Sequence, residues 1–278
     1  QTDMGTGVVD FVSMAAGEAD AALDKQRNGR ARIIALDALD DATLCEAGRL
    51  IWTGPKTGFA VGSQGIEYAL VAHWREAGAL PREHTPPQLK PVEQLFAVNG
   101  SCAPTTATQI DHAKANGFEL LDFDASAAVD PDSLKAELNR TLETSLALLS
   151  EGRDVLVTTA RGPDDPSVAR MTETLQRAGV SSNEANERLG RALGTCVAEI
   201  RTRTGLPRAA VGGGDTSGHA LTALKAEALS AVAPLAAGAP LCKIHSQKSP
   251  AMDGLEVTLK GGQMGAPTFF MQAKTGAV

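Results

Sequence analysis

The sequence predicts an α/β fold with a mostly parallel sheet that is covered by helices on both faces. Short apolar runs alternate along the chain with longer segments whose apolar residues recur at helical spacing. Several of the apolar runs end in loops rich in glycine and hydroxyl residues, and one proline-rich segment interrupts the alternation. Together these observations favour two α/β domains joined by a linker.

Residues 1–77 are expected to form the C-terminal part of an N-terminal domain. The expected elements, in order, are a helix over Glu18–Lys25, a strand over Arg32–Leu36, a helix around Thr43–Ile51, a short strand over Phe59–Val61, and a helix with Ile66, Ala69, Leu70 and His73 or Trp74 on its apolar side. A Gly-Ser-Gln-Gly turn connects the last two. Because Gln1 is not an initiator residue, we expect a truncated domain and a chain that is part of a longer protein.

Residues 78–92 are predicted to be a linker. Pro81, Pro86, Pro87 and Pro91 lie close together in this stretch. Proline removes a backbone donor and restricts φ, so the segment should be stiff and extended. The remaining residues, 93–278, should then form a second domain.

The second domain repeats the unit of strand, loop and helix. The expected elements are a strand and helix in "QLFAVNGSCAPTTATQIDHAKANG", a helix with Asp130 as N-cap, Pro131 at its first position and Gly152 past its end, a buried strand in "DVLVTTARGP", and an amphipathic helix with Leu189, Leu193, Cys196, Val197 and Ile200 on one stripe. Two further strands are expected in "RAAVGGG" and "LEVTLKGG".

The loops that follow these strands have an unusual composition. They are Asn99-Gly100-Ser101, Thr158 to Arg161, Gly212 to Gly218, and Lys260-Gly261-Gly262. Ligands of open α/β sheets collect at the carboxyl ends of the strands, and successive glycines let a backbone approach a ligand closely. Free N–H groups at a helix N-terminus favour an anion, so these loops suit a phosphate group.

The stretch "VGGGDTSGHA", residues 211–220, matches neither common phosphate-binding motif. It lacks the lysine of the P-loop, and its glycines are spaced one residue wider than the dinucleotide fingerprint. A tight turn with Thr216 or Ser217 as N-cap is an equal alternative from spacing alone. Asp215 could likewise be a cap or a partner of the helix dipole.

Taken in order, these segments resemble the signatures of the four-carbon acid sugar kinase family. "GGGDTSGHAL" and "EVTLKGGQMGAPTFF" are similar to the two C-terminal loops of that family, "VNGSC" with "TTATQI" to the loop that opens its nucleotide-binding domain, and "VGSQGIEYALVAHW" to the end of its N-terminal domain. The resemblance covers essentially the whole chain. It implies that residues 93–278 bind ATP and that the N-terminal domain binds the acid sugar.

The resemblance also implies which residues contact ATP. These are Asn99, Gly100, Ser101, Gly213, Gly214, Asp215, Thr216, Ser217 and Gly262. The chain departs from the family pattern at Asp215, where Glu is commoner, at Asn99, where Ser is expected, and in the last loop, where Gly261, Gln263 and Met264 replace Ser, Asn and Phe. Backbone contacts to phosphate should survive these changes.

Individual side chains suggest roles within this site. Asp215 is the only acid in a glycine-rich loop, so it is the candidate catalytic residue, either as a ligand of Mg²⁺ or by orienting the acceptor. Lys260 either places a cation near phosphate or is a solvated lysine, and Arg161 is a weaker candidate of the same kind. Ser101 either contacts ATP or caps the helix that begins near Thr105.

Ser63 and Gln64, in the N-terminal part, are expected to contact substrate or to pack at a domain interface. The family's opening A-D-D-x-T-G-A segment is absent from this sequence. We therefore expect the chain to bind ATP without phosphorylating an acid sugar.

Composition limits the functions that remain. With 278 residues, 43% hydrophobic residues and a net charge of −7, the chain resembles an ordinary globular protein and offers no global positive field for nucleic acid or an anionic membrane. Four scattered cysteines and five scattered histidines suggest reduced thiols and no zinc site. No apolar run is long enough to span a bilayer, and a cytoplasmic location is expected.

The leading functional hypothesis is an ATP- and Mg²⁺-dependent kinase acting on a four-carbon sugar acid such as a threonate, an erythronate or a 3-oxo-tetronate. Its expected partners are that sugar acid and ATP, and a homodimer is compatible with the sequence, which does not define the oligomeric state. The alternatives are a dinucleotide-binding oxidoreductase and a catalytically silent nucleotide-binding fragment.

Overall fold

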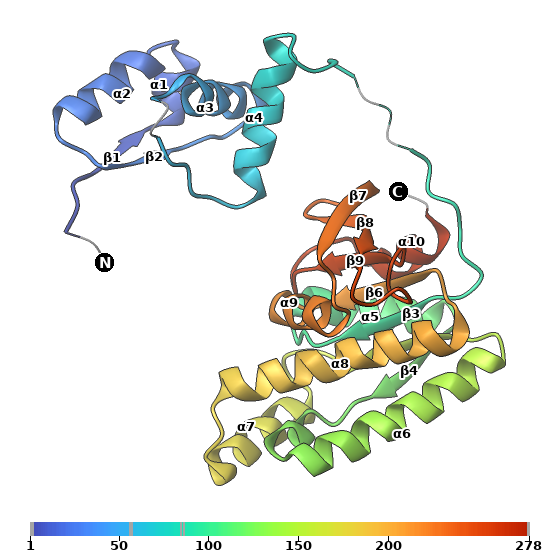
Figure 1. Ribbon diagram of the computed structural model, residues 1–278. Coiled ribbons are helices and arrows are strands. Elements are labelled where there is room, and N and C mark those ends of the chain that lie inside the picture. The colour runs from blue at the N-terminus through green and yellow to red at the C-terminus, as the bar shows by residue number, and fades with distance from the viewer. Residues whose placement is uncertain (1–2, 56–57, 84, 86, 277–278) are drawn as a thin grey trace. The chain divides into compact units, whose positions relative to one another are not determined.

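The computed structural model describes residues 3–55, 58–83, 85 and 87–276, and the chain divides into two compact units (Figure 1). Unit 1 covers residues 1–85 and unit 2 covers residues 86–278. This division falls within the predicted linker 78–92, of which His84 and Pro86 lie outside the described residues. The stiffness of that segment and the ligand of each unit stay predictions.

Unit 1 combines a two-stranded parallel sheet with short helices (Figure 1). Its elements are β1 (Thr6–Val9), α1 (Phe11–Ala15), α2 (Ala19–Asn28), β2 (Ile33–Leu36), α3 (Asp41–Thr53) and α4 (Gln64–Glu76). The strands pair from Thr6 with Ile33 to Val9 with Leu36. The core is small and consists of Val9, Met14, Ala19, Leu23, Ala47 and Leu50.

The structure confirms most of the elements predicted for unit 1. The three predicted helices correspond to α2, α3 and α4, and the predicted strand at 32–36 corresponds to β2. The predicted strand at Phe59–Val61 is wrong: this segment is in no sheet, and the two side chains are 92% and 84% exposed. A strand needs a hydrogen-bonded neighbour, and the described residues of unit 1 provide none for this segment.

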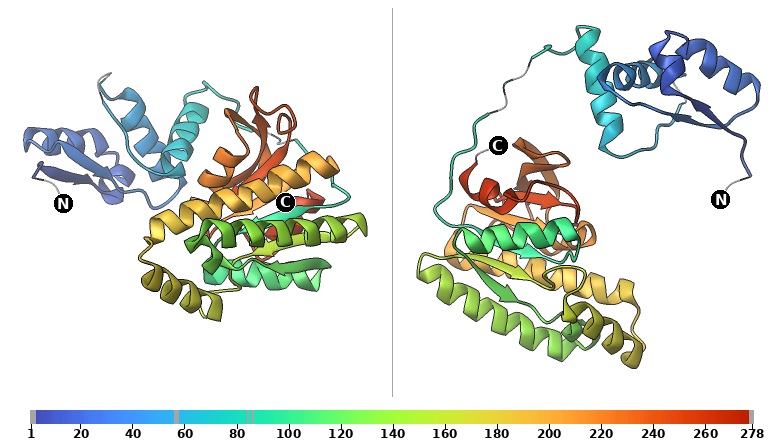
Figure 2. Two further views of the ribbon diagram at one scale, coloured as in Figure 1. Left: turned by 60° about the horizontal axis from the view of Figure 1, so that its bottom comes forward. Right: turned by 180° about the vertical axis from the view of Figure 1, so that it is seen from behind.

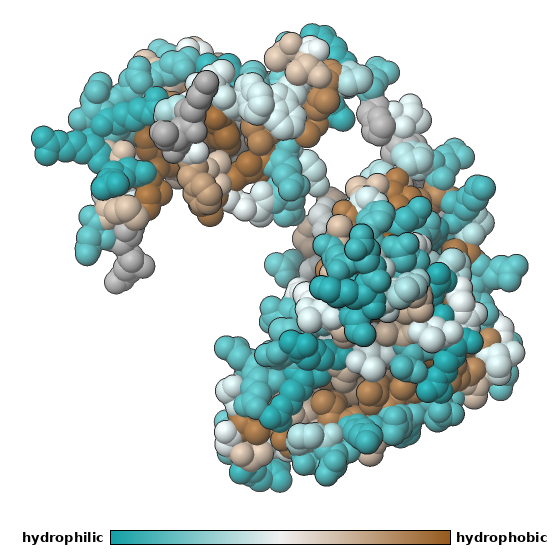
Figure 3. Space-filling model, in the orientation of Figure 1, coloured by the Kyte–Doolittle hydropathy of each residue, from teal (hydrophilic) through white to brown (hydrophobic). Residues whose placement is uncertain are grey.

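Large apolar side chains are exposed mainly on unit 1. Its surface includes brown, apolar areas in Figure 3. The exposed ones in unit 1 are Met4, Val8, Val12, Ile33, Leu39, Trp52, Phe59, Val61, Tyr68 and Leu80, whereas unit 2 has Leu229. Unit 1 therefore buries its apolar residues less completely than unit 2.

Unit 2 is built on a seven-stranded sheet with the order β4-β5-β3-β6-β9-β8-β7. Its elements are β3 (Phe96–Asn99), α5 (Pro104–Ala115), β4 (Phe118–Asp122), η1 (Ala125–Val129), α6 (Pro131–Ser150), β5 (Asp154–Thr158), α7 (Pro166–Ala178), α8 (Ser182–Thr204), β6 (Arg208–Gly212), α9 (Gly214–Ala223), β7 (Ala228–Ala236), β8 (Ala239–His245), β9 (Glu256–Lys260) and α10 (Phe269–Thr275). Strands β4, β5, β3, β6 and β9 are parallel, and β8 and β7 continue the sheet antiparallel. The predicted mostly parallel sheet is confirmed.

Helices cover both faces of this sheet, as predicted (Figures 1 and 2). Side chains alternate along each strand. Val98 and Val157 therefore pack into a core with residues of α6, α8 and α9, while Ala97 and Leu156 pack into a second core with residues of α5 and α10. Both faces are buried, which explains why these strands are short, continuous apolar runs.

The predicted ends and faces of the long helices of unit 2 are also confirmed. The side chain of Asp130 accepts a hydrogen bond from the backbone N–H of Ser133 at 2.7 Å, and Pro131 is the first residue of α6. Gly152 follows the helix with a φ of +81°. The predicted stripe of α8, from Leu189 to Ile200, is buried. None of the helices that the structure describes is both long and apolar enough to cross a bilayer.

Close packing of α8 against α9 depends on two glycines of α8. A Cβ atom at Gly194 would lie 2.6 Å from the Cα of Ala220, and one at Gly190 would lie 2.7 Å from the Cβ of His219. Only a hydrogen atom fits at either position without movement of α9. Because α9 follows the glycine-rich loop 212–214, this packing defines where that loop lies.

Candidate nucleotide-binding site

The four loops predicted to bind phosphate emerge side by side at one edge of the sheet of unit 2. Asn99 pairs in register with Thr158 on one side and with Gly212 on the other, and Gly212 pairs with Lys260. The ends of β5, β3, β6 and β9 therefore form one row. The register brings together residues that are far apart in the sequence.

Backbone hydrogen bonds connect three of these loops. The N–H of Gly100 donates to the carbonyl of Gly212 at 2.9 Å, and the N–H of Gly213 donates to the carbonyl of Lys260 at 2.8 Å. A Cβ atom at Gly100 would collide with the hydroxyl of Thr216, and Gly213 has a φ of +110°. Glycine is therefore required at both positions for the loops to approach one another.

Asn99 is fully buried and organises the first loop. Its amide nitrogen donates to the carbonyl of Ser101 at 2.9 Å and to the hydroxyl of Thr158 at 3.0 Å. Thr158 in turn donates to the carbonyl of Ala160 at 2.7 Å. The side chain of Asn99 thus links the loops after β3 and β5.

Ser101 faces the last loop. Its hydroxyl accepts from the N–H of Ala103 at 3.2 Å, and a Cβ atom at Gly262 would lie 2.6 Å from the same oxygen. Helix α5 begins at Pro104 with Ala103 as N-cap and no side-chain cap. Ser101 therefore supports the turn before the helix rather than capping it.

Helix α9 begins within the glycine-rich loop, with Gly213 as its N-cap and no side-chain cap. The alternative prediction of Thr216 or Ser217 as N-cap is wrong, because both lie inside the helix and Ser217 donates its hydroxyl proton to the carbonyl of Gly213 at 2.6 Å. The first N–H groups of a helix have no partner within the helix. With no side chain to cap them, they are available to an anion.

Gly214 and Asp215 lie at the exposed start of this helix. A Cβ atom at Gly214 would meet no atom within 4 Å. The carboxylate of Asp215 is exposed and has neither a hydrogen bond nor an ion pair in the described part of the chain. It is therefore free to interact with a ligand or a metal, and it does not cap the helix.

Lys260 is buried although its side chain is charged. Its ammonium nitrogen lies 3.1 Å from the hydroxyl of Thr106 and 3.2 Å from each of the carbonyl oxygens of Gly261 and Gly262. The ring of Phe269 lies 5.8 Å away. Burial lowers the pKa of this lysine from 10.5 to about 8. The alternative of a solvated lysine is wrong, because the side chain is 1% exposed.

Other basic residues of the same unit show what is unusual about Lys260. Arg208 is also buried, but it forms an ion pair with Glu256 at 2.7 Å. Lys274 pairs with the buried Asp154 at 2.6 Å. Among the described residues, no carboxylate pairs with Lys260. A buried cation without an anion beside it is costly, so a phosphate group would compensate its charge.

Two buried residues of this region were not identified from the sequence. Thr106 and Gln109 of α5 are 0% exposed and contact the loop after β9. Their spacing of three residues places them on one helix face, together with the apolar Ile110 and Ala113. Polar residues on the buried face of a helix were the signal that could have identified them.

The remaining predicted site residues lie in unit 1. Ser63 is the N-cap of α4 without a side-chain hydrogen bond to the helix, and Gln64 is its first residue. Both are exposed. Substrate contact through Ser63 and Gln64 stays a prediction.

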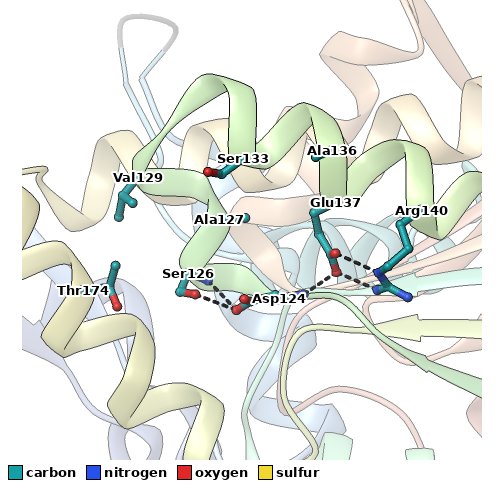
Figure 4. A pocket seen from close by; sticks show the side chains of 9 residues that line it. All are labelled: Asp124, Ser126, Ala127, Val129, Ser133, Ala136, Glu137, Arg140 and Thr174. Atoms are coloured by element: carbon teal, nitrogen blue, oxygen red, sulfur yellow. Dashed lines mark hydrogen bonds and ion pairs between the residues drawn. The ribbon is translucent and has the colours of Figure 1, made fainter.

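Of two hollows on unit 2, one lies away from this row of loops, and the other touches only its β5 end, through Thr159 and Arg161. The larger, about 550 Å³, lies between η1, α6 and α7, and Figure 4 shows that its charged groups are paired: Glu137 with Arg140, and Asp124 with Ser126. The smaller, about 270 Å³, lies at the ends of β4 and β5. Arg161 lines the smaller one and is paired with Asp122 at 2.8 Å. This pairing weakens Arg161 as a phosphate ligand.

Residues 96–270 match the family model of the nucleotide-binding C-terminal domain. The chain is 41% identical over 245 residues to a 3-oxo-isoapionate kinase of Paraburkholderia graminis, covering 88% of this chain and 52% of that protein. It is 28% identical over 249 residues to a 3-oxo-tetronate kinase of Cupriavidus necator, covering 89% and 52%. A D-threonate kinase of Salmonella typhimurium is 26% identical over 242 residues, covering 87% and 53%. The chain thus spans about half the length of these relatives.

Solved structures share the fold. A Haemophilus influenzae protein of family DUF1537 superposes with a TM-score of 0.62 at 17% identity, over 98% of this chain and 61% of that one. A Bordetella bronchiseptica protein with bound citrate, a domain-swapped dimer, gives a TM-score of 0.51 at 20% identity, over 97% and 58%. The family model covers more than half of the chain, and the kinases named above match nearly nine-tenths of it. The chain therefore belongs to the four-carbon acid sugar kinase family and carries the nucleotide-binding C-terminal domain of that family.

Proposed function

We propose that this chain supplies the ATP-binding part of a kinase that phosphorylates a hydroxyl group of a small sugar acid. The observation that carries the proposal is the buried ammonium of Lys260, without a carboxylate partner in the described residues, beside three glycine-containing loops. A polyphosphate would supply the missing negative charge. Membership of a kinase family supports ATP over a dinucleotide as the ligand.

The residues that would hold ATP differ in how they act. The uncapped N-terminus of α9, from Gly213 to Ser217, and the backbone around Gly262 would bind phosphate oxygens. Ser101 would contact the nucleotide directly, and Gly100 would let the loops close on it. Asn99 would act through Ser101, because its amide is already engaged.

Asp215 would serve a magnesium ion held mainly by the nucleotide. Mg²⁺ is commonly bound by one or two carboxylates together with phosphates and water. In the part of the chain that the structure describes, no group of three or more His, Cys, Asp or Glu side chains could hold a metal. A single exposed carboxylate beside the phosphate loop fits that arrangement. Bound Mg²⁺ would neutralise charge on the phosphates, and Asp215 would orient it or the acceptor hydroxyl.

The acceptor is proposed to be a 3-oxo sugar acid. The relative with 41% identity is named for 3-oxo-isoapionate, and other relatives are named for 3-oxo-tetronate and D-threonate. The acceptor would be bound by the N-terminal domain, including Ser63 and Gln64. A homodimer is proposed as the assembly, in keeping with the domain-swapped dimer of the Bordetella relative.

A chimera would test this function. The matching region of the Paraburkholderia 3-oxo-isoapionate kinase is replaced by this chain, and ADP release is followed over 3-oxo-isoapionate, 3-oxo-tetronate and D-threonate. We expect turnover by the chimera, loss of turnover after Lys260→Met, and ATP binding without turnover by the chain alone. A folded chimera that binds ATP but releases no ADP would contradict the kinase role. Rapid turnover by the chain alone would contradict the placement of the acceptor site.

A further inference from the structure

Helix α5 directs two buried polar side chains, Thr106 and Gln109, at the loop that follows β9. Both are 0% exposed, and neither belongs to the row of strand-end loops. Buried polar groups destabilise a fold unless they find hydrogen-bond partners. The partners of these two residues therefore indicate what they do.

Thr106 connects the first loop to the last. Its hydroxyl donates to the carbonyl of Gly262 at 2.7 Å and accepts from the ammonium of Lys260 at 3.1 Å. The hydroxyl oxygen of Ser101 lies 3.3 Å away. Because a hydroxyl has one proton, the short bond to Gly262 uses it, and the lone pairs remain for the other two groups.

Gln109 holds the turn that follows. Its amide nitrogen lies 2.9 Å from the carbonyl oxygen of Met264, 3.1 Å from that of Gly265 and 3.0 Å from that of Ala266. Gly265 has a φ of +84°, a value that residues other than glycine rarely adopt. The two N–H groups of this buried amide are thus shared among three consecutive carbonyl groups, and its oxygen has no hydrogen-bond partner in the described part of the chain.

These contacts engage carbonyl oxygens along most of the 260–266 loop. Thr106 and Lys260 engage those of Gly261 and Gly262, and Gln109 engages those of Met264, Gly265 and Ala266. The partial negative charges of these oxygens are therefore directed into the protein, toward buried donors. That orientation favours the approach of an anion to the other side of the loop.

We propose that Thr106 and Gln109 are positioning residues that hold the 260–266 loop in the conformation that receives ATP. This inference rests on the proposed function, because it assumes that the loop contacts phosphate. The two side chains act through the loop and do not touch the nucleotide. They would change affinity for ATP by changing how often the loop is correctly formed.

Matched variants of α5 test this role. Thr106→Val and Gln109→Leu remove the hydrogen bonds at nearly constant volume, and Thr106→Ser keeps the hydroxyl. Thr108→Val is the control, since Thr108 is exposed on the same helix and, among the residues that the structure describes, its hydroxyl reaches only the carbonyl of Pro104, at 3.4 Å. Amide hydrogen exchange of residues 261–266 is measured without ligand, and ATP affinity is measured by calorimetry.

We expect about tenfold faster exchange in the loop and about tenfold weaker ATP binding for Thr106→Val and for Gln109→Leu, with wild-type values for Thr106→Ser and Thr108→Val. The two disruptive variants are independent, so one that fails to fold leaves the other to decide. Unchanged exchange in a folded variant, or changed exchange with unchanged ATP affinity, would overturn the positioning role alone. Absence of ATP binding by the wild-type chain would instead overturn the proposed function on which it rests.

Discussion

The ammonium nitrogen of Lys260 lies 3.1 Å from the hydroxyl oxygen of Thr106, in a site that is 1% exposed and offers only neutral acceptors among the described residues. Three neutral partners satisfy the three N–H groups of the lysine but leave its charge uncompensated. A bound anion can therefore compensate this charge. Because the charge depends on pH, both the stability of the fold and the affinity for ATP should depend on pH.

Stability should rise with pH through the range in which Lys260 loses its proton. Burial lowers the pKa of Lys260 to about 8 in the folded chain, from 10.5. Between these values the unfolded chain binds more protons, so the contribution of Lys260 to the free energy of unfolding increases as pH rises from 8 to 10.5 and is flat below 8. Urea unfolding of wild type and Lys260→Met from pH 7 to 10 measures this contribution as the difference between their free energies of unfolding. A constant difference between the two proteins would contradict this assignment.

ATP affinity should show the opposite trend. The protonated form of Lys260 attracts phosphate, so wild-type affinity should fall by at most about tenfold per pH unit above the pKa of about 8. Lys260→Met should bind ATP weakly and without this dependence. Calorimetric titrations at pH 7, 8 and 9 give both values. Parallel pH profiles for the two proteins would show that another group is responsible.

Gly214→Val should abolish ATP binding without harming the fold. A Cβ atom at Gly214 meets no protein atom within 4 Å, so the free energy of unfolding should change by less than about 0.5 kcal/mol. The added side chain would occupy space that phosphate needs, so affinity should fall by at least about two orders of magnitude, to no measurable binding. Gly214→Ala should give an intermediate loss. Wild-type affinity in a folded Val variant would place the nucleotide elsewhere.

Asp215→Asn should weaken the binding of Mg²⁺ more than the binding of the adenosine group. Wild type is expected to bind Mg·ATP more tightly than free ATP, and the variant should bind the two almost equally. In the chimera, kcat should fall on the order of 100-fold. Asp132→Asn is the matched control, because Asp132 is also an acid in the first turn of a helix, α6, away from the glycine loops. A retained preference for Mg·ATP would leave Asp215 as a partner of the helix dipole.

Gly194→Ala should destabilise unit 2 by about 1–3 kcal/mol, because its methyl group would lie 2.6 Å from the Cα of Ala220. Gly218→Ala, on the facing helix α9, should stabilise it by up to about 1 kcal/mol, since open space surrounds that position. Thermal unfolding of both variants measures the difference. Equal effects would mean that α8 and α9 do not pack this closely.

Much of the fold of unit 2 could be predicted because its central strands are buried on both faces. The runs that end at Asn99, Thr158 and Gly212 contain continuous apolar stretches that stand out from their loops, whereas the strand that ends at Lys260 alternates polar and apolar residues. Elements that bury little were missed: α7 has one buried residue, Leu175, and β7 is mostly exposed. The amino-acid pattern of such a segment does not show which of its residues neighbouring elements will bury.

The candidate site was predictable in its loops but not in its contacts. Glycine-rich strand ends indicate a ligand, whereas the register that aligns Asn99 with Gly212 arises from tertiary structure. Nothing local distinguishes the buried Lys260 from an exposed lysine, and the partners of Gln109 lie more than 150 residues away along the chain. At Phe59–Val61 the error is of the opposite kind. A strand was predicted from an apolar run, but the run has no neighbouring strand in the described part of unit 1 and remains exposed.

Parallel calorimetric titrations of this chain with Mg·ATP and with NAD test the central claim most directly. The claim is that the loops after β3, β6 and β9, with Lys260 behind them, form an ATP site. It predicts saturable binding of one Mg·ATP per chain, loss of that binding in Gly214→Val, weaker binding in Lys260→Met, and no saturable binding of NAD. Saturation by NAD without binding of Mg·ATP, or undiminished ATP binding in both variants, would contradict it.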